Sequence, residues 1–313
     1  MMTTGNMQAL IRAELWSTQL KEILTDELAA QRYVDWLSEF PDGDTFTIPS
    51  IGQATVRDYV ENDAVVYEAL DTGEFQFQIT EYVSSAHYIT KKALQDSYKG
   101  PMVLAAFVPK QSRAIGERIE TDIYALQGQQ TASNQNLING AEHRFVANGT
   151  GESMSVADFA RVLYSLKKAN VPDKGLVGIV DPSVEFTLNT LTNLVNVSNN
   201  PKWEGLVTTG MASGPTFMRN IYGFDIYTSN YLADANEQID SKTTTAGKAN
   251  LFFSMSGPDI LPFKGAFRQM PEVDGEYNKD RQREEFVTTC RYGLKLYRPE
   301  NFVVVLSDTD VVS

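Results

Sequence analysis

The stretch KGLVGIVDPSVEFTL at residues 174–188 decides the fold. Its five-residue apolar run, Leu176 to Val180, stands between Lys174-Gly175 and Asp181-Pro182, which predicts a short buried strand. Asp181 is then a helix cap and Pro182 the first residue of a second helix. Upstream, the capping-box pattern at 155–158 starts a helix that should end before Pro172. The unit is therefore helix, strand, helix.

Further extended segments follow this unit toward the C-terminus. The alternation of apolar and polar residues predicts strands at Ile221–Ser229, Leu251–Met255, Phe286–Tyr297 and Phe302–Leu306. We expect the last two to form a hairpin through residues 298–301. Residues 198–220 and 236–248 are expected to be long polar loops, and 272–285 a mixed-charge insert. The last strands should return to a sheet begun earlier, so the fold class is α+β.

The segment before the unit is dominated by one long helix. Ile115, Ile119, Ile123 and Leu126 recur at helical spacing, with charged residues on the other faces, and predict a helix over about 109–126. A short helical piece is expected at 90–98, before Gly100-Pro101. Residues 128–153 are rich in Gln, Asn, Gly, Ser and Thr and predict a loop-rich seam.

The first ninety residues alternate between a helix and extended pieces. An amphipathic helix is expected within residues 10–30, followed by extended pieces at 45–48, 64–70 and 75–79. Asp71-Thr72-Gly73 is interpreted as the turn of a hairpin. The second strand of this hairpin has only one apolar face. We therefore expect an acidic arm that is not buried on both sides within its own subunit.

The charge balance excludes some classes of function. The chain has 313 residues, with 27 Lys and Arg against 40 Asp and Glu, giving a net charge of −13. Residues 1–100 alone hold 16 acidic and 7 basic side chains. Such a chain is not built to bind nucleic-acid phosphates tightly. No apolar run is long enough to span a membrane, and the start lacks a secretion signal, so no membrane partner is expected.

The residue types used in catalysis and metal binding do not occur in any pattern typical of a site. The single cysteine, Cys290, lies in an apolar alternating run that favours a small buried side chain. His87 is expected at a strand end, and neither it nor His143 has metal-ligand spacing. No nucleotide-binding glycine loop or nucleophile elbow occurs. We expect no catalytic residue, no metal site and no cofactor.

Three local strings, together with the order of the elements, resemble one family. The strings are GIVDP at 178–182, IYGFDIYTSN at 221–230 and YGLKLYRPENF at 292–302. In this order they are similar to the major capsid proteins of tailed bacteriophages, which share the Hong Kong ninety-seven shell fold. The resemblance covers nearly the whole chain.

The resemblance implies a division of the chain. It comprises an N-terminal arm at 1–43, an extended loop or hairpin arm at 44–90, a peripheral domain with a long spine helix at 91–149, an axial domain at 150–262 and peripheral return strands at 263–313. The implied function is that of a structural virion protein, made and assembled in the host bacterial cytoplasm. It would form the pentamers and hexamers of an icosahedral shell around packaged double-stranded DNA.

The resemblance also implies partners. These are other copies of the chain, a scaffolding protein, a portal, a decoration protein and loosely held double-stranded DNA. We expect no crosslink between subunits. The alternatives are an encapsulin-like nanocompartment shell and an acidic cytoplasmic α+β enzyme.

The candidate site residues belong to assembly rather than catalysis. The expected intersubunit arm residues are Phe46, Ile48, Glu68, Asp71, Gly73, Phe75 and Phe77. A structural turn is expected at Arg298, Pro299 and Glu300. A strand edge left open on such an arm is suited to lie across a neighbouring copy.

Overall fold

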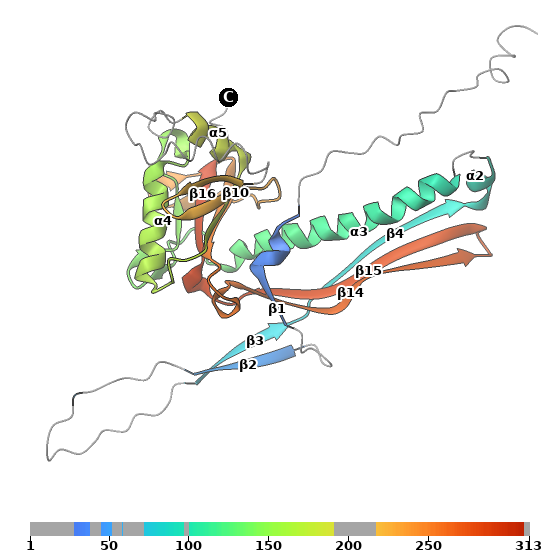
Figure 1. The fold of residues 1–313 in the computed structure, drawn as a ribbon, viewed down its shortest axis with the longest axis horizontal. Coiled ribbons are helices and arrows are strands. Elements are labelled where there is room, and N and C mark those ends of the chain that lie inside the picture. The colour runs from blue at the N-terminus through green and yellow to red at the C-terminus, as the bar shows by residue number, and fades with distance from the viewer. Residues whose placement is uncertain are drawn as a thin grey trace, which may run out of the picture.

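A computed structural model describes residues 28–37, 45–51, 58, 72–96, 100–190 and 217–309. A globular part with most of the short elements lies at one end, and an elongated part made of one long helix and a β-ribbon extends from it (Figure 1). A separate strand pair, β2 with β3, leaves the molecule near the base of the ribbon and points away from the ribbon's free end (Figure 1). The fold is α+β, as expected.

The globular part is built on a six-stranded sheet with the order β7-β16-β13-β8-β10-β9. Its strands are β7 (Arg144–Val146), β8 (Leu176–Val180), β9 (Phe217–Ile221), β10 (Phe224–Thr228), β13 (Gly247–Ser254) and β16 (Val303–Asp308). All five residues of β8 are buried, which confirms the strand predicted there. The strands predicted near 251–255 and 302–306 are confirmed as β13 and β16.

Two helices of this part begin as the sequence predicts. In α4 (Val156–Lys168) the Ser155 backbone N–H donates to the Asp158 carboxylate at 2.9 Å, which closes the capping box. In α5 (Pro182–Thr190) the Asp181 carboxylate accepts from the Ser183 backbone N–H at 2.9 Å. The apolar face of α4 packs into the core through Phe159, whose ring lies edge-on to Phe252 at 5.6 Å.

The elongated part combines a four-stranded sheet with the long helix. The sheet has the order β1-β14-β15-β4. Its strands are β1 (Val34–Leu37), β4 (Glu81–Thr90), β14 (Phe263–Asn278) and β15 (Arg283–Leu296). The helices are α2 (Lys91–Asp96) and α3 (Gly100–Ala125), and α3 runs along the ribbon (Figure 1). The two last strands pair with strands from earlier in the chain: β15 pairs with β4, and β16 pairs with β7. This confirms that the last strands return to sheets begun earlier.

Small elements fill the connections. They are the 3₁₀ turns η1 (Ala30–Tyr33), η2 (Leu126–Gln129), η3 (Thr150–Glu152), η6 (Pro258–Ile260) and η7 (Pro299–Asn301), the strand pair β5 (Leu137–Ile138) with β6 (Ala141–Glu142), and the pair β11 (Gln238–Ile239) with β12 (Lys242–Thr243). The last pair lies inside the segment expected to be a plain polar loop. That loop therefore contains a small hairpin.

The long helix starts earlier than predicted. It begins at Gly100 rather than near residue 109. Gly100-Pro101 lies in the first turn of this helix, where proline is tolerated because its missing N–H needs no partner. The predicted short helix before it is confirmed as α2.

Three other expectations are wrong in their pairing. Residues 272–285 are not an insert, because they form the free end of the β14–β15 hairpin. Residues 298–301 do not close a hairpin, because β15 and β16 belong to different sheets. The strand predicted at 221–229 is interrupted at Tyr222-Gly223, where both residues have positive φ and form a tight turn between β9 and β10.

His87 also lies elsewhere than expected. It is inside β4, opposite Phe286 of β15, rather than at a strand end. Its side chain is exposed, and its Nε2 lies 3.4 Å from the Ser85 hydroxyl. Cys290 is fully buried, as its position in the alternating run predicted.

Some expectations fall outside the described residues. These are most of the helix predicted within 10–30, the extended piece at 64–70, the end of the helix beyond Thr190 and most of the loop at 198–220. Among the helices that the structure describes, none is long and apolar enough to cross a membrane.

Candidate assembly surfaces

The projecting arm is an antiparallel pair of two strands. β2 (Thr45–Ile51) pairs with β3 (Thr72–Gln78) in a register that places Phe46 opposite Phe77 and Ile48 opposite Phe75. Thr72 and Gly73 are residues of β3, so the turn predicted at 71–73 is wrong. The connection between the strands is the twenty-residue segment 52–71. Gly and Thr next to an Asp suggested a local turn, while the true partner strand lies much earlier in the sequence.

The base of the arm is fixed to its own chain. Phe77 and Ile79 are buried together with Ala266 of β14. A Cβ on Gly293 of β15 would lie 2.7 Å from the Gln78 carbonyl oxygen, so the arm passes directly over this glycine. Phe77 therefore anchors the arm, and only the part beyond it is free to meet another molecule.

The polar side of the arm base is held by one lysine. Lys295 donates to the Gln76 carbonyl at 2.6 Å, and its ammonium group lies 4.8 Å from the centre of the Phe75 ring. The half-buried Phe75 also meets Tyr297 edge-on at 4.8 Å. These contacts set the direction in which the arm leaves the body.

The other candidate arm residues are placed only in part. Gly73 pairs with Ser50, and Ile48 is half-buried. Glu68 and Asp71 lie outside the described residues.

The long helix receives the N-terminal segment through a buried carboxylate. Glu120 is fully buried and accepts the backbone N–H groups of Ala29 at 3.1 Å and Ala30 at 2.8 Å. The Tyr124 hydroxyl donates to the same carboxylate at 2.8 Å. Burial, the nearby Glu120 charge and this hydrogen bond raise the pKa of Tyr124 well above its usual range. Glu120 therefore fixes the point where the N-terminal segment joins the spine helix.

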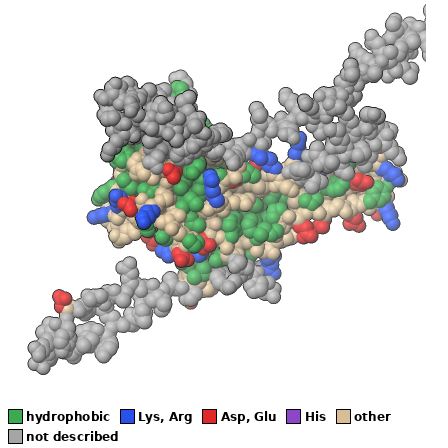
Figure 2. Space-filling view, in the orientation of Figure 1, with side chains coloured by type: hydrophobic (Ala, Val, Ile, Leu, Met, Phe, Trp, Pro, Cys, Tyr) green, Lys and Arg blue, Asp and Glu red, His purple; other side chains and the backbone are tan. Residues whose placement is uncertain are grey.

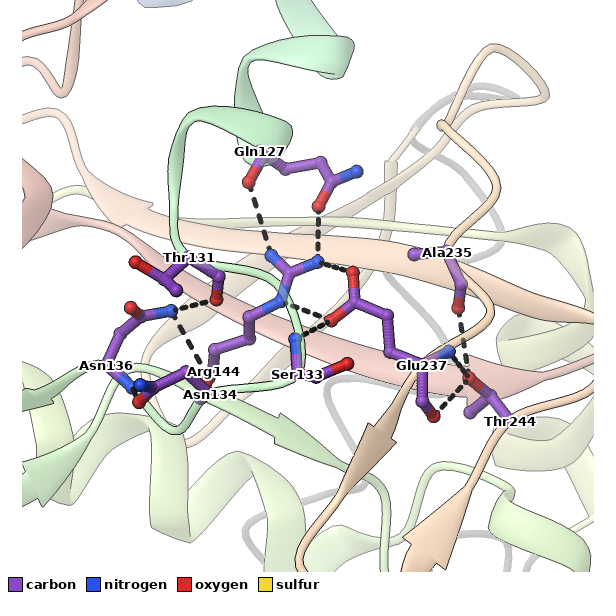
Figure 3. A network of polar contacts seen from close by, with 9 residues as sticks. All are labelled: Gln127, Thr131, Ser133, Asn134, Asn136, Arg144, Ala235, Glu237 and Thr244. Carbon is purple, nitrogen blue, oxygen red and sulfur yellow. Dashed lines mark hydrogen bonds and ion pairs between the residues drawn. The ribbon is translucent and has the colours of Figure 1, made fainter.

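The end of the spine helix is joined to the globular part by a buried ion pair. Arg144 is 1 % exposed and makes two hydrogen bonds to the Glu237 carboxylate, at 2.6 and 2.9 Å. It also donates to the carbonyl and side-chain oxygens of Gln127, at 3.2 and 2.7 Å. Figure 3 shows the guanidinium group between these two residues, with the Ser133 backbone N–H donating to Glu237. The network couples three segments that are far apart in sequence.

In this network the charges of Arg144 and Glu237 compensate each other. Burial alone would raise the pKa of Glu237, but the hydrogen bonds from Arg144 and Ser133 outweigh it and hold the pKa below its usual value of 4.5. The carboxylate is therefore ionised near neutral pH, and the buried Arg144 has its counterion.

Arg298, Pro299 and Glu300 form the connection between the two large sheets. Pro299–Asn301 is a 3₁₀ turn, and Arg298 Nε donates to the Asp259 carbonyl at 2.6 Å. Asn301 is buried and donates to the Ser254 and Ile260 carbonyls. The turn borders a hollow of about 540 Å³ that is also lined by the end of α4 and by η6. The hydrogen bonds of Arg298 and Asn301 fix this turn where the chain passes from one sheet to the other.

The ribbon presents exposed aromatic and sulfur-containing side chains. Tyr82 and Tyr88 of β4 are 64 % and 59 % exposed, and Met270 of β14 is 66 % exposed. β4 alternates strictly at its start, so Tyr82 lies on the face opposite Val83, which packs into the core.

The remaining side chains that could take part in catalysis or metal binding are a cysteine and two histidines. Burial raises the pKa of the Cys290 thiol to about 11, so the thiol is protonated near neutral pH in the folded chain. Burial lowers the pKa of His143, which is far from His87 in the fold. In the described part of the chain, no three His, Cys, Asp or Glu side chains cluster to hold a metal ion.

Sequence reasoning missed the residues that fix these surfaces. Glu120, Arg144 and Glu237 read as ordinary surface charges, because their partners are about ninety residues away. Gly293 carried a signal of its own, since a glycine inside a strand often marks a close backbone approach. The partner segment at Gln78 was not deducible.

One family model matches most of the chain. The family model described as "Phage capsid protein" matches residues 41–305. No curated protein matches the chain.

Solved structures share the fold. A chain from Mycobacterium phage Che8 is 19% identical, with a TM-score of 0.68, covering 93% of this chain and 96% of the other. A capsid chain of cyanophage P-SCSP1u is 14% identical, with a TM-score of 0.73, covering 98% and 95%. A capsid chain of cyanophage Pam1 is 11% identical, with a TM-score of 0.69, covering 95% and 97%.

Proposed function

Because the chain belongs to the phage capsid protein family and is a major capsid protein of an icosahedral virion shell, we propose that its β2–β3 arm joins neighbouring copies. The fold is the Hong Kong ninety-seven type that the sequence resembles. A shell subunit of this family is a structural protein and not an enzyme. We further propose that α3 is the spine helix of the subunit and that the β2–β3 arm belongs to its extended loop.

The observation that carries the proposal is the contrast between the two faces of β3. Phe77 and Ile79 are buried in their own chain, whereas Glu74, Gln76 and Gln78 of β3 are exposed. The two-stranded pair has no further strand on either side among the described residues. Isolated two-stranded pairs are marginally stable in water, so a neighbouring copy that covers the arm adds the missing contacts.

We propose that copies clasped in this way form the pentamers and hexamers of the shell. Contacts between two different surfaces of one chain close into rings, and the same chain serves both ring sizes. The proposed further partners are a scaffolding protein, a portal, a decoration protein and packaged double-stranded DNA. The net charge of −13 favours only loose contact with that DNA.

Shortening the arm without touching its base tests the proposal. Residues 52–71 would be replaced by Asn-Gly, a two-residue turn that joins Ile51 to Thr72, which face each other in the register. The variant keeps Phe75 and Phe77, so we expect a soluble, folded chain that forms no shells in electron micrographs. Shells at the parent yield would contradict the proposal.

A second variant separates the length of the arm from its chemistry. It carries twenty Gly and Ser residues in place of 52–71 and keeps the original reach. If side chains of the arm contact the neighbour, this variant also fails to assemble. If reach alone were sufficient, it would assemble like the parent.

A further inference from the structure

The free end of the ribbon has an open border. β1 pairs with β14 only over Phe263–Ala266, and β15 lies on the other side of β14. From Phe267 to Asn278, β14 therefore has no strand partner on its outer side among the described residues. An open, exposed strand border is a site for contact with another chain.

This border is lined with acidic side chains. Glu272, Asp274 and Glu276 alternate along β14, so they share one face of the sheet at a spacing of roughly 7 Å. All three are exposed, and none takes part in a salt bridge with another described residue. We call these three residues the acidic border.

The tip of the same ribbon is basic. Lys279 and Arg281 lie in the turn between β14 and β15, and Lys92 lies beside it on α2. The Lys91 backbone N–H donates to the Gln282 carbonyl at 2.9 Å, which holds the start of α2 against the turn. We call Lys92, Lys279 and Arg281 the basic tip.

The basic tip is neutralised only in part from within, because Asp280 lies between Lys279 and Arg281. The hydrogen bond from Arg283 and, to a smaller extent, the charge of Arg281 lower the pKa of Glu285. Nearby Arg283 is already occupied, because it forms an ion pair with Glu285 at 2.5 Å and lies 4.3 Å from the Tyr88 ring centre. Lys92, Lys279 and Arg281 are exposed and form no salt bridge with any residue in the described ranges. Figure 2 shows Lys and Arg side chains gathered at the free end of the ribbon and Asp and Glu side chains along its lower border.

We propose that the basic tip of one copy docks on the acidic border of a second copy. This inference rests on the proposed function, because it names a contact between assembled subunits. Three exposed cations and three exposed carboxylates on one ribbon, none of them in a salt bridge with a described residue, are complementary between copies. The two patches differ, so the contact is heterologous and leads from copy to copy.

A second copy fits this surface better than nucleic acid does. A phosphate backbone that approached the tip would meet the acidic border a few residues away and be repelled by it. A protein surface with both signs satisfies both patches at once. The acidic arm segment, with Asp58, Glu61, Asp63, Glu68 and Asp71 against Arg57, is a competing target within the second copy.

Charge reversal with rescue tests the docking. One variant, K279E/R281E, reverses the tip, a second, E272K/E276K, reverses the border, and a third carries all four changes. Shell yield is measured by sedimentation and electron microscopy, and thermal unfolding of the unassembled subunit checks the fold. We expect about a tenfold loss of shells in each two-site variant, since several charge pairs are broken per contact. The four-site variant should recover the parent yield.

Each other outcome overturns the docking. Two-site variants that assemble like the parent, or a four-site variant that stays defective, would contradict it. If K279E/R281E is rescued by E61K/E68K instead, the tip binds the arm. If it forms normal shells that fail to retain DNA, the tip binds nucleic acid. A parent chain that forms no shells even when its scaffolding protein is present would instead refute the proposed function.

Discussion

At the scale of single residues, buried charges hold together segments that the sequence separates widely. Glu120 receives three donors from two elements, and Arg144 receives a full set of acceptors from two others. When a buried charge has all its partners, their hydrogen bonds offset much of the free energy lost on removing it from water. When one partner is removed, a buried polar group is left without compensation and the folded state is destabilised. These two residues therefore control where the N-terminal segment and the globular part meet the spine helix.

The Glu120 contact predicts a specific loss of stability. In Glu120→Gln the amide nitrogen replaces one carboxylate oxygen, so the backbone N–H of either Ala29 or Ala30 then faces a donor instead of its acceptor. We expect the free energy of unfolding to fall by about 1–3 kcal/mol in denaturant titrations. The matched control is Glu117→Gln on the same helix, whose 3.1 Å pair with Arg113 is partly exposed. That change should cost about 0.5 kcal/mol or less, and equal losses in both variants would contradict the role given to Glu120.

The Arg144–Glu237 pair predicts a dependence on pH. The pKa of Glu237 is lower in the folded chain than its usual 4.5, so the unfolded chain binds the proton more readily. The pair therefore stabilises the fold above that value and loses its effect as the pH falls through the folded pKa. Glu237→Gln should be strongly destabilised near neutral pH, because Arg144 is left buried without a counterion.

Unfolding midpoints across the acid range check this prediction. The gap in unfolding midpoint between Glu237→Gln and the parent should narrow as the pH falls from 4.5 through the lowered pKa of Glu237 in the folded chain. Asp234→Asn, which removes the exposed partner of Lys248, is the control and should leave a small gap at every pH. A gap that stays constant for Glu237→Gln would show that the carboxylate charge is not what matters.

At the scale of elements, the arm depends on a close approach to β15. Gly293 leaves room for the backbone of Gln78 and Ile79, with 2.7 Å from an added Cβ to the Gln78 carbonyl oxygen and 3.0 Å to the Ile79 Cα. Backbone atoms cannot move aside as a flexible side chain does. The arm base would have to lift off the sheet to accommodate any larger residue.

Gly293→Ala should therefore affect both stability and assembly. We expect a loss of about 1–3 kcal/mol in the free energy of unfolding, together with fewer shells, because the arm leaves the body in a changed direction. Gly128→Ala is the control, since nothing lies within 4 Å of a Cβ at that position. It should change stability by no more than about 0.5 kcal/mol. Parent-like behaviour of Gly293→Ala would contradict the account of the arm base.

Local sequence patterns predicted the helices and strands well, but they did not predict which strands pair with each other. The capping box at Ser155 and the apolar run of β8 are signals contained within a few residues, and both are confirmed. The pairing of β3 with β2 and the ribbon at 272–285 depend on segments that are distant or share little sequence signal. A mixed-charge strand exposed on both faces has no apolar alternation, so the free end of the ribbon resembled an insert.

At the scale of the whole molecule, the order of the elements carried the most information. The strings at 178–182, 221–230 and 292–302 pointed to the shell fold, and the family match confirms the recognition. The candidate surfaces were predictable only in outline. The partner of a surface patch lies on another copy of the chain. The hydrophobic periodicity of one chain therefore does not show which patches contact each other.

The most direct test of the central claim is a single-particle cryo-electron microscopy reconstruction of assembled particles. The account predicts closed shells in which residues 52–71 of one copy are traced across a neighbouring copy, while Phe77 stays buried in its own chain. An arm folded back on its own subunit would contradict the claim. So would a chain that remains a compact monomer at high concentration.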